Sequence, residues 1–199
     1  MRFIGITGAI GAGKTEIINY IKANYSCEVY LADEVAHWVK EKGTLGYERI
    51  VTLLGDEILD VDGEIHKGKM AEKIFADETL LEQVNHIIHP LVQEFLLDKY
   101  RKAKENNCCE YFFVEAALLI EAGYSDLVDE MWYVYADRET RCRRLMENRG
   151  YSEEKIRSIF AKQLSEEEFR RACDFVIDNS GTKEDAFRQV DARLCKQKM

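Results

Sequence analysis

The chain has 199 residues, of which 46% are hydrophobic and 33% charged, and its formal net charge is −9. This length and balance predict a globular protein with a sizeable core and exclude an intrinsically disordered chain. The acidic charge also argues against general nucleic-acid binding, because phosphate backbones require a basic face.

The first predicted strand begins almost at Met1, which leaves no room for a signal peptide, and no apolar run is long enough to span a bilayer. The six cysteines show neither a C-x-x-C pair nor a disulfide or zinc framework, so we expect reduced thiols. These features predict a cytoplasmic protein with no membrane partner.

Five short, mostly apolar runs have the character of strands buried on both faces. In chain order they are Phe3–Thr7, Glu28–Ala32, Tyr111–Glu115, Met131–Tyr135 and Phe175–Ile177. Segments with helical periodicity lie between them. The alternation predicts an α/β fold with a parallel sheet covered by helices on both sides, and ligands that bind beyond the carboxyl ends of the strands.

Two stretches interrupt this alternation. Residues 60–107 are expected to be helical after a turn at Asp62-Gly63, with a break between helices at Pro90. Residues 138–172 are helical and rich in arginine. We therefore expect a core formed by residues 1–59 and 108–199, a substrate-side insertion at 60–107, and a lid at about 138–172.

The most informative motif directly follows the first strand. Gly8-Ala9-Ile10-Gly11-Ala12-Gly13-Lys14-Thr15 fits the phosphate-binding pattern G-x-x-x-x-G-K-[ST] between a strand and a helix. Backbone N–H groups of such a turn converge on phosphate oxygens, and the helix adds its positive N-terminal end. Lys14 is expected to reach the outer phosphates and the Thr15 hydroxyl to bind Mg²⁺.

Two carboxylates end predicted strands. Asp33 follows the second strand, where it could accept a proton from a substrate hydroxyl or bind Mg²⁺, or could instead cap a helix over Glu34–Lys40. Glu115 ends the third strand, where a contact to Mg²⁺ or substrate and a helix cap are again the two interpretations. Position alone does not separate these alternatives.

The arginines of the 138–172 stretch could close over phosphates or could form a solvent-facing, ion-paired helix. Arg141 and Arg144 share a helix face, and guanidinium groups suit the charge of a transferring phosphoryl group. His86 and His89 also share a face, but no cysteine or carboxylate completes a metal site there. The Cys108-Cys109 pair is expected to pack in the core.

The whole chain resembles the dephospho-coenzyme A kinase family. The phosphate loop is shared by many families, but the other elements, in this order, are more specific. They are Ala32-Asp33-Glu34-Val35-Ala36-His37, Ile88-His89-Pro90-Leu91-Val92, Leu118-Leu119-Ile120-Glu121, Arg144-Leu145-Met146 and Ala172-Cys173-Asp174-Phe175-Val176-Ile177-Asp178-Asn179-Ser180-Gly181.

The resemblance implies a P-loop NTPase three-layer sandwich with a parallel central sheet, a helical acceptor-binding insertion and a helical lid. It also implies ATP-dependent phosphorylation of the ribose 3′-hydroxyl of dephospho-coenzyme A, the last step of coenzyme A biosynthesis, with Mg²⁺. Asp33 matches the family's proposed base, and Lys14 and Arg144 complete the expected catalytic set. A monomer is expected.

The remaining expected contacts divide between the two substrates. The expected ATP-binding residues are Gly8, Ile10, Gly11, Ala12, Gly13, Lys14, Thr15, Glu16, Arg141, Arg144 and Asn179, the last near the adenine. The expected acceptor-binding residues are Asp33, His37, His89, Glu115 and Leu118.

Four positions depart from the family's common pattern: Glu16, Leu31, Ala117 and Asn148. At Asn148 the family usually has an arginine, and in this chain Arg149 is the next residue. None of them removes Lys14, Thr15 or Asp33, so we expect activity. Two rival functions are a kinase for another small metabolite and a nucleotide-dependent switch that hydrolyses without an acceptor. No Asn/Thr-Lys-x-Asp guanine-reading element supports the switch.

Overall fold

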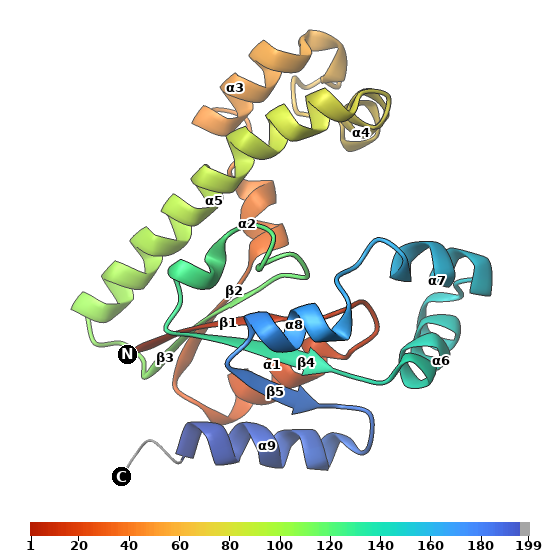
Figure 1. Cartoon of the computed structure of the whole chain (residues 1–199). Coiled ribbons are helices and arrows are strands. Elements are labelled where there is room, and N and C mark those ends of the chain that lie inside the picture. Colours follow the sequence, from red (N-terminus) through yellow and green to blue (C-terminus); the bar gives the residue numbers. More distant parts are fainter. Residues whose placement is uncertain (196–199) are drawn as a thin grey trace. The chain divides into compact units, whose positions relative to one another are not determined.

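A computed structural model describes residues 1–195 (Figure 1). The elements in chain order are β1 (Arg2–Thr7), α1 (Lys14–Asn24), β2 (Cys27–Leu31), α2 (Ala32–Trp38), α3 (Leu45–Leu54), η1 (Asp56–Ile58), α4 (Lys67–Phe75), α5 (Glu78–Glu105), β3 (Tyr111–Glu115), η2 (Tyr124–Asp126), β4 (Glu130–Tyr135), α6 (Arg138–Arg149), α7 (Glu153–Phe160), α8 (Glu166–Ala172), β5 (Phe175–Asp178) and α9 (Lys183–Cys195).

The five strands form one sheet in the order β2-β3-β1-β4-β5. β1 pairs in parallel with β3 and with β4, and β4 pairs in parallel with β5. The expected strands lie within one residue of these bounds, and the parallel α/β fold is confirmed. β1 is the central strand, so the loop that follows it leaves the middle of the sheet, where such folds bind ligands.

The described chain divides into two compact units, residues 1–29 with 106–195 and residues 30–105. In the first unit, alternate β4 side chains point to opposite faces of the sheet. Tyr133 stacks on Phe169 of α8, with ring centroids 4.6 Å apart. Helix α9 contacts both α1 and β5. Fully buried Trp132, Phe112 and Ile4 fill the sheet interior.

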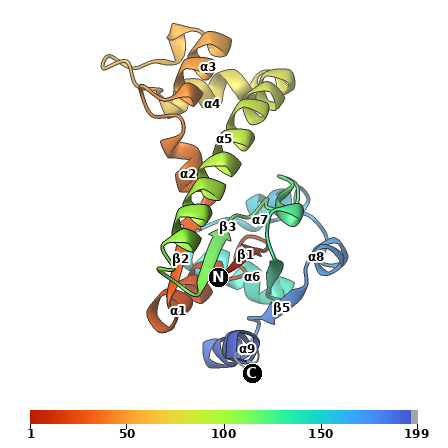
Figure 2. The same ribbon diagram turned by 90° about the vertical axis from the view of Figure 1, so that its left-hand side faces the viewer.

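In the second unit, α2, α3 and α4 all contact the long helix α5 (Figure 2). Between α3 and α4 the chain turns at Asp60–Gly63, where the Gly63 N–H donates to the Asp60 carbonyl and Gly63 has a φ of 75°. This is the turn expected at Asp62-Gly63. The sequence assigned 60–107 to the insertion, whereas the compact unit begins at Tyr30; the acceptor-binding role of this region stays a prediction.

The expected break at Pro90 is wrong, because α5 runs without interruption from Glu78 to Glu105 with Pro90 inside it. Proline removes one helical hydrogen bond, but packing against neighbouring helices can hold a helix through it. Val84, Ile88, Val92 and Leu96 follow one another at four-residue spacing on both sides of Pro90, and all are buried. This apolar stripe keeps the two halves in one helix.

The expected core packing of the Cys108-Cys109 pair is only half correct. Cys109 is buried, but Cys108 is exposed. Within residues 1–195, no helix combines the length and apolar character needed to cross a bilayer.

Candidate active site

The phosphate loop connects β1 to α1, which begins at Lys14. Gly13 precedes the helix with a φ of 93°, and a Cβ there would lie 2.3 Å from Asn179 Nδ2. A Cβ on Gly8 would lie 2.4 Å from the Val134 carbonyl oxygen. Both positions therefore require glycine. Each has a positive φ, which residues with a side chain rarely adopt, and at each a Cβ would clash with a neighbouring atom.

Lys14 and Glu115 lie together beside this loop. The Lys14 ammonium donates to the Gly8 carbonyl at 2.8 Å and lies 3.6 Å from Glu115 Oε1. Only 13% and 17% of the two side chains are exposed. Glu115 is followed by turns and not by a helix, so its interpretation as a helix cap is wrong. The structure places it against the lysine of the phosphate loop.

The Ala12 carbonyl oxygen joins the loop to two distant segments. It accepts a hydrogen bond from Asn179 Nδ2 at 2.8 Å and another from Arg144 at 3.2 Å. Arg144 also donates to the Asn179 carbonyl at 2.9 Å. Arg144 of α6 and buried Asn179 therefore hold the loop and each other, a role for Asn179 that the sequence did not reveal.

A cavity of about 420 Å³ opens beside these contacts. Its lining residues are Gly13, Thr15, Glu16, Arg144, Asn148, Asn179 and Lys183. Five of these were named from the sequence as ATP-binding candidates. Lys183 was missed because it carries no motif: it is the first residue of α9, and only the fold brings α9 near the phosphate loop.

The side chain of Arg141 has other contacts than that of Arg144. Its guanidinium lies 4.3 Å from the centroid of the Phe160 ring in α7, and its Nε is buried with no hydrogen-bond partner in the described part of the chain. Gln163, which follows α7, also contacts the phosphate loop. Its Oε1 accepts a hydrogen bond from the Ile10 N–H at 3.3 Å. No local pattern in the sequence marks Gln163.

In the second unit, Asp33 lies in the first turn of α2 and is exposed. The helix begins at Ala32, so Asp33 is not its N-cap and that interpretation is wrong. Asp33 lines a cavity of about 950 Å³, whose other lining residues are Glu34, His37, Trp38, Lys40, Glu41, Glu64, Ile65, Lys67 and Met70. Candidate His37 is among them, whereas candidate His89 is not.

The charges in this cavity interact. Burial, and after it the positive charge of Lys67, lower the pKa of Lys40, while the Asp33 carboxylate raises it. The recess thus holds two lysines, Lys40 and Lys67, and the apolar side chains of Trp38, Ile65 and Met70. Four carboxylates also line it: Asp33, Glu34, Glu41 and Glu64. His89 is exposed on α5, where partial desolvation and then His86 lower its pKa. Leu118, in the first unit, is exposed.

A family model described as dephospho-CoA kinase matches residues 2–185. A dephospho-CoA kinase of Thermobifida fusca is 35% identical over 193 residues, covering 97% of this chain and 92% of that protein. One from Streptococcus pyogenes serotype M3 is also 35% identical, covering 96% of this chain and 95% of the other.

Solved structures agree on the fold. A crystal structure from Thermus thermophilus is 28% identical, with a TM-score of 0.81 over 98% of this chain and 97% of the other. Dephospho-CoA kinase from Campylobacter jejuni has a TM-score of 0.73 at 23% identity, covering 99% and 98% of the two chains. Sequence and fold together establish that this chain belongs to the dephospho-CoA kinase family.

Proposed function

We propose that this chain transfers the γ-phosphoryl group of ATP to the ribose 3′-hydroxyl of dephospho-coenzyme A, giving coenzyme A and ADP. The observation that carries the proposal is the phosphate loop held by Arg144 and Asn179, in a chain of this family. The oxygen of the acceptor hydroxyl forms a bond to the γ-phosphorus, and the bond from that phosphorus to the ADP oxygen breaks. The hydroxyl proton leaves to a base.

On the ATP side, Lys14 and the backbone N–H groups of Gly11–Thr15 bind the β- and γ-phosphates. Lys14 leaves the Gly8 carbonyl for a phosphate oxygen, with Glu115 beside it. Arg144 is near enough to the loop to neutralise charge that develops during transfer, and Asn148 and Lys183 extend the same cavity.

The donor set beside the loop fits Mg²⁺. The exposed Thr15 hydroxyl stands at the start of α1 and the Glu115 carboxylate lies beside Lys14, and both are the hard oxygen ligands that Mg²⁺ prefers. Thr15 would hold the ion directly and Glu115 through water. When bound, Mg²⁺ neutralises phosphate charge. Asp33 stays a predicted further ligand.

On the acceptor side, we assign Asp33 as the group that orients the 3′-hydroxyl and accepts its proton. The cavity around Asp33 fits the two chemical parts of the acceptor. Lys40 and Lys67 suit its diphosphate, and Trp38 and Ile65 offer apolar surface for its base or its pantetheine arm. His37 lines the same cavity, and His89 and Leu118 stay predicted acceptor contacts.

The test is ADP release by the purified chain with Mg-ATP, with and without dephospho-coenzyme A, and the mass of the product. We expect ADP only with the acceptor, and one phosphate added to it. Acceptor-independent turnover would support a nucleotide-dependent switch. Transfer to other alcohols but not to dephospho-coenzyme A would support a kinase for another metabolite. A cytoplasmic monomer stays our expectation.

A further inference from the structure

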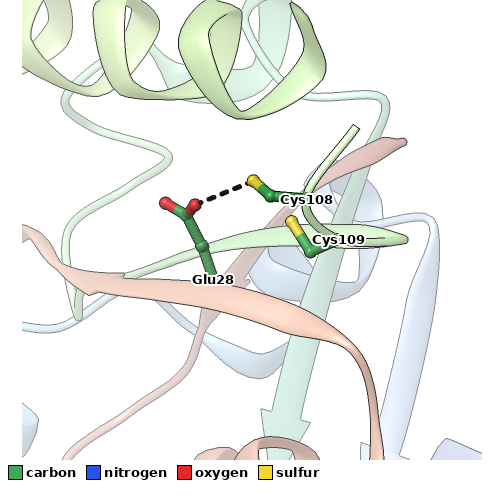
Figure 3. A group of neighbouring side chains, drawn as sticks. All are labelled: Glu28, Cys108 and Cys109. Atoms are coloured by element: carbon green, nitrogen blue, oxygen red, sulfur yellow. Dashed lines mark hydrogen bonds between the residues drawn. The ribbon is translucent and has the colours of Figure 1, made fainter. Parts of the chain in front are cut away.

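Three metal-binding side chains meet far from the phosphate loop. Glu28 is the second residue of β2, and Cys108 and Cys109 precede β3. Figure 3 shows their ligand atoms directed toward one another. The Cys108 thiol donates to Glu28 Oε1 at 3.3 Å, and the ligand atoms of all three residues lie within 4.8 Å of one another.

The backbone holds this group in place. The Ser26 carbonyl accepts the N–H groups of Glu110 at 2.9 Å and of Tyr111 at 3.2 Å, which ties the segment after the two cysteines to the start of β2. Just before the cysteines, Asn107 turns the chain with a φ of 50°. Two chain segments far apart in sequence are therefore fixed side by side, and the three side chains do not depend on a single mobile loop.

We propose that Glu28, Cys108 and Cys109 form a binding site for a thiophilic divalent cation of the zinc type. Thiolate sulfur and carboxylate oxygen are both ligands of Zn²⁺, and water would take the fourth position of a tetrahedron. Ligand atoms around tetrahedral zinc lie about 3.3–3.8 Å apart, given metal–ligand bonds of about 2.0–2.3 Å. The 3.3 Å separation at Glu28 and Cys108 already has this value.

The surroundings favour a soft cation over Mg²⁺ or Ca²⁺. The Met1 sulfur lies 3.4 Å from the Cys109 sulfur, so the site has a third sulfur neighbour. Binding releases one proton from each thiol to solvent. Within residues 1–195, no other cluster of three such ligands meets the same distance limit.

This site is separate from the phosphate loop. Tyr111 at the start of β3 pairs with Arg2 at the start of β1, so the cysteines lie beyond the amino ends of the strands. The phosphate loop follows the carboxyl end of β1, a strand length of about 16 Å away. The proposed cation would therefore join β2 to the segment before β3 and take no part in phosphoryl transfer.

The test is titration of the reduced full-length chain with Zn²⁺ against a chromophoric chelator, repeated with Cd²⁺ to observe thiolate-to-metal charge-transfer absorption. We expect one ion per chain. Cys108→Ser, Cys109→Ser and Glu28→Gln should each weaken binding by about tenfold or more. Exposed Cys195→Ser and exposed Glu110→Gln, which removes a carboxylate beside the cysteine pair, are matched controls that should bind like the original chain.

ATP turnover and circular dichroism of every variant provide the folding check, because none of these residues belongs to the kinase site. Should buried Cys109→Ser fail to fold, exposed Cys108→Ser still decides the question. The proposal is overturned if the reduced chain binds no Zn²⁺, or if Cys108→Ser and Glu28→Gln bind it as tightly as the two controls. Zinc binding with no kinase activity would leave this site intact and count only against the proposed function.

Discussion

The side-chain amide of Asn179 donates a 2.8 Å hydrogen bond to the Ala12 carbonyl, from the end of β5 to the phosphate loop. Because Asn179 is buried, its removal leaves a cavity and takes away one of the two donors to that carbonyl. We expect Asn179→Ala to lower the free energy of unfolding by about 1–3 kcal/mol and to raise the KM for ATP. Urea unfolding and steady-state kinetics measure the two effects.

Asn148→Ala is the control for this change, because Asn148 lines the same cavity but is exposed on α6. It should leave stability unchanged. Equal stability of the Asn179 and Asn148 variants would contradict the bracing role of Asn179.

Arg144 and Arg143 are adjacent on α6 but differ in environment. Arg144 donates to the Ala12 and Asn179 carbonyls, whereas Arg143 is exposed. We expect Arg144→Ala to lower kcat by about 10²–10³-fold, because a positioned charge at the transferring phosphate is lost. Arg143→Ala should retain kcat. Similar kcat values for the two variants would show that Arg144 only braces the loop.

Asp33→Asn tests the proposed base. The change keeps the size of the side chain and removes its ability to accept a proton, so kcat should fall by roughly 10²–10⁴-fold while the fold is retained. The neighbouring exposed carboxylate offers a matched variant, Glu34→Gln, which should stay active. An Asp33→Asn enzyme within threefold of the original kcat would remove Asp33 from the mechanism.

Lys40 and Lys67 test the acceptor cavity. Alanine at either position should raise the KM for dephospho-coenzyme A several-fold and leave the KM for ATP unchanged, because both line the Asp33 cavity and not the phosphate-loop cavity. Lys102→Ala, which removes an exposed charge of α5 paired with Asp98, is the control. A parallel rise in both KM values would refute the division of the two substrates between these cavities.

Tyr20 provides a pH prediction about stability. Its hydroxyl donates to Asp191 of α9 at 2.7 Å, and this bond raises the pKa of Tyr20 to about 12. The folded chain therefore keeps the phenol proton more tightly than the unfolded chain does, so the stabilisation is complete below pH 10 and is lost as the pH rises toward 12. Tyr20→Phe should show a smaller loss of stability over that range. An unchanged pH dependence would contradict this assignment.

The strands and the phosphate loop could be predicted from the sequence, because a buried apolar run and a glycine pattern are local signals. The predicted break at Pro90 was wrong because proline's local preference for ending a helix was outweighed by the packing of the buried stripe from Val84 to Leu96. That packing is a tertiary effect. The alternative in which Asp33 caps a helix over Glu34–Lys40 is wrong, because α2 begins one residue before Asp33 with Leu31 as its N-cap.

The site was predictable where a motif named its residues and hidden where only the fold brought them together. Lys14 and Arg144 stand out in the sequence, and both lie at the loop. Gln163 and Lys183 reach the same region from segments more than a hundred residues away, with no local pattern to mark them. Arg141 lies on the same helix face as Arg144, but its guanidinium lies over the ring of Phe160.

The hydrogen bond from the Ile10 N–H to Gln163 bears on the strength of nucleotide binding. A phosphate oxygen that accepted from the Ile10 N–H would replace Gln163 Oε1 as its partner. The gain in nucleotide affinity would then be only the difference between a charge-assisted hydrogen bond and a neutral one. The reverse exchange would follow when ADP departs, with Gln163 again accepting from the N–H. Gln163 would thus weaken the binding of nucleotide, and with it the retention of product, relative to a loop whose Ile10 N–H had no partner.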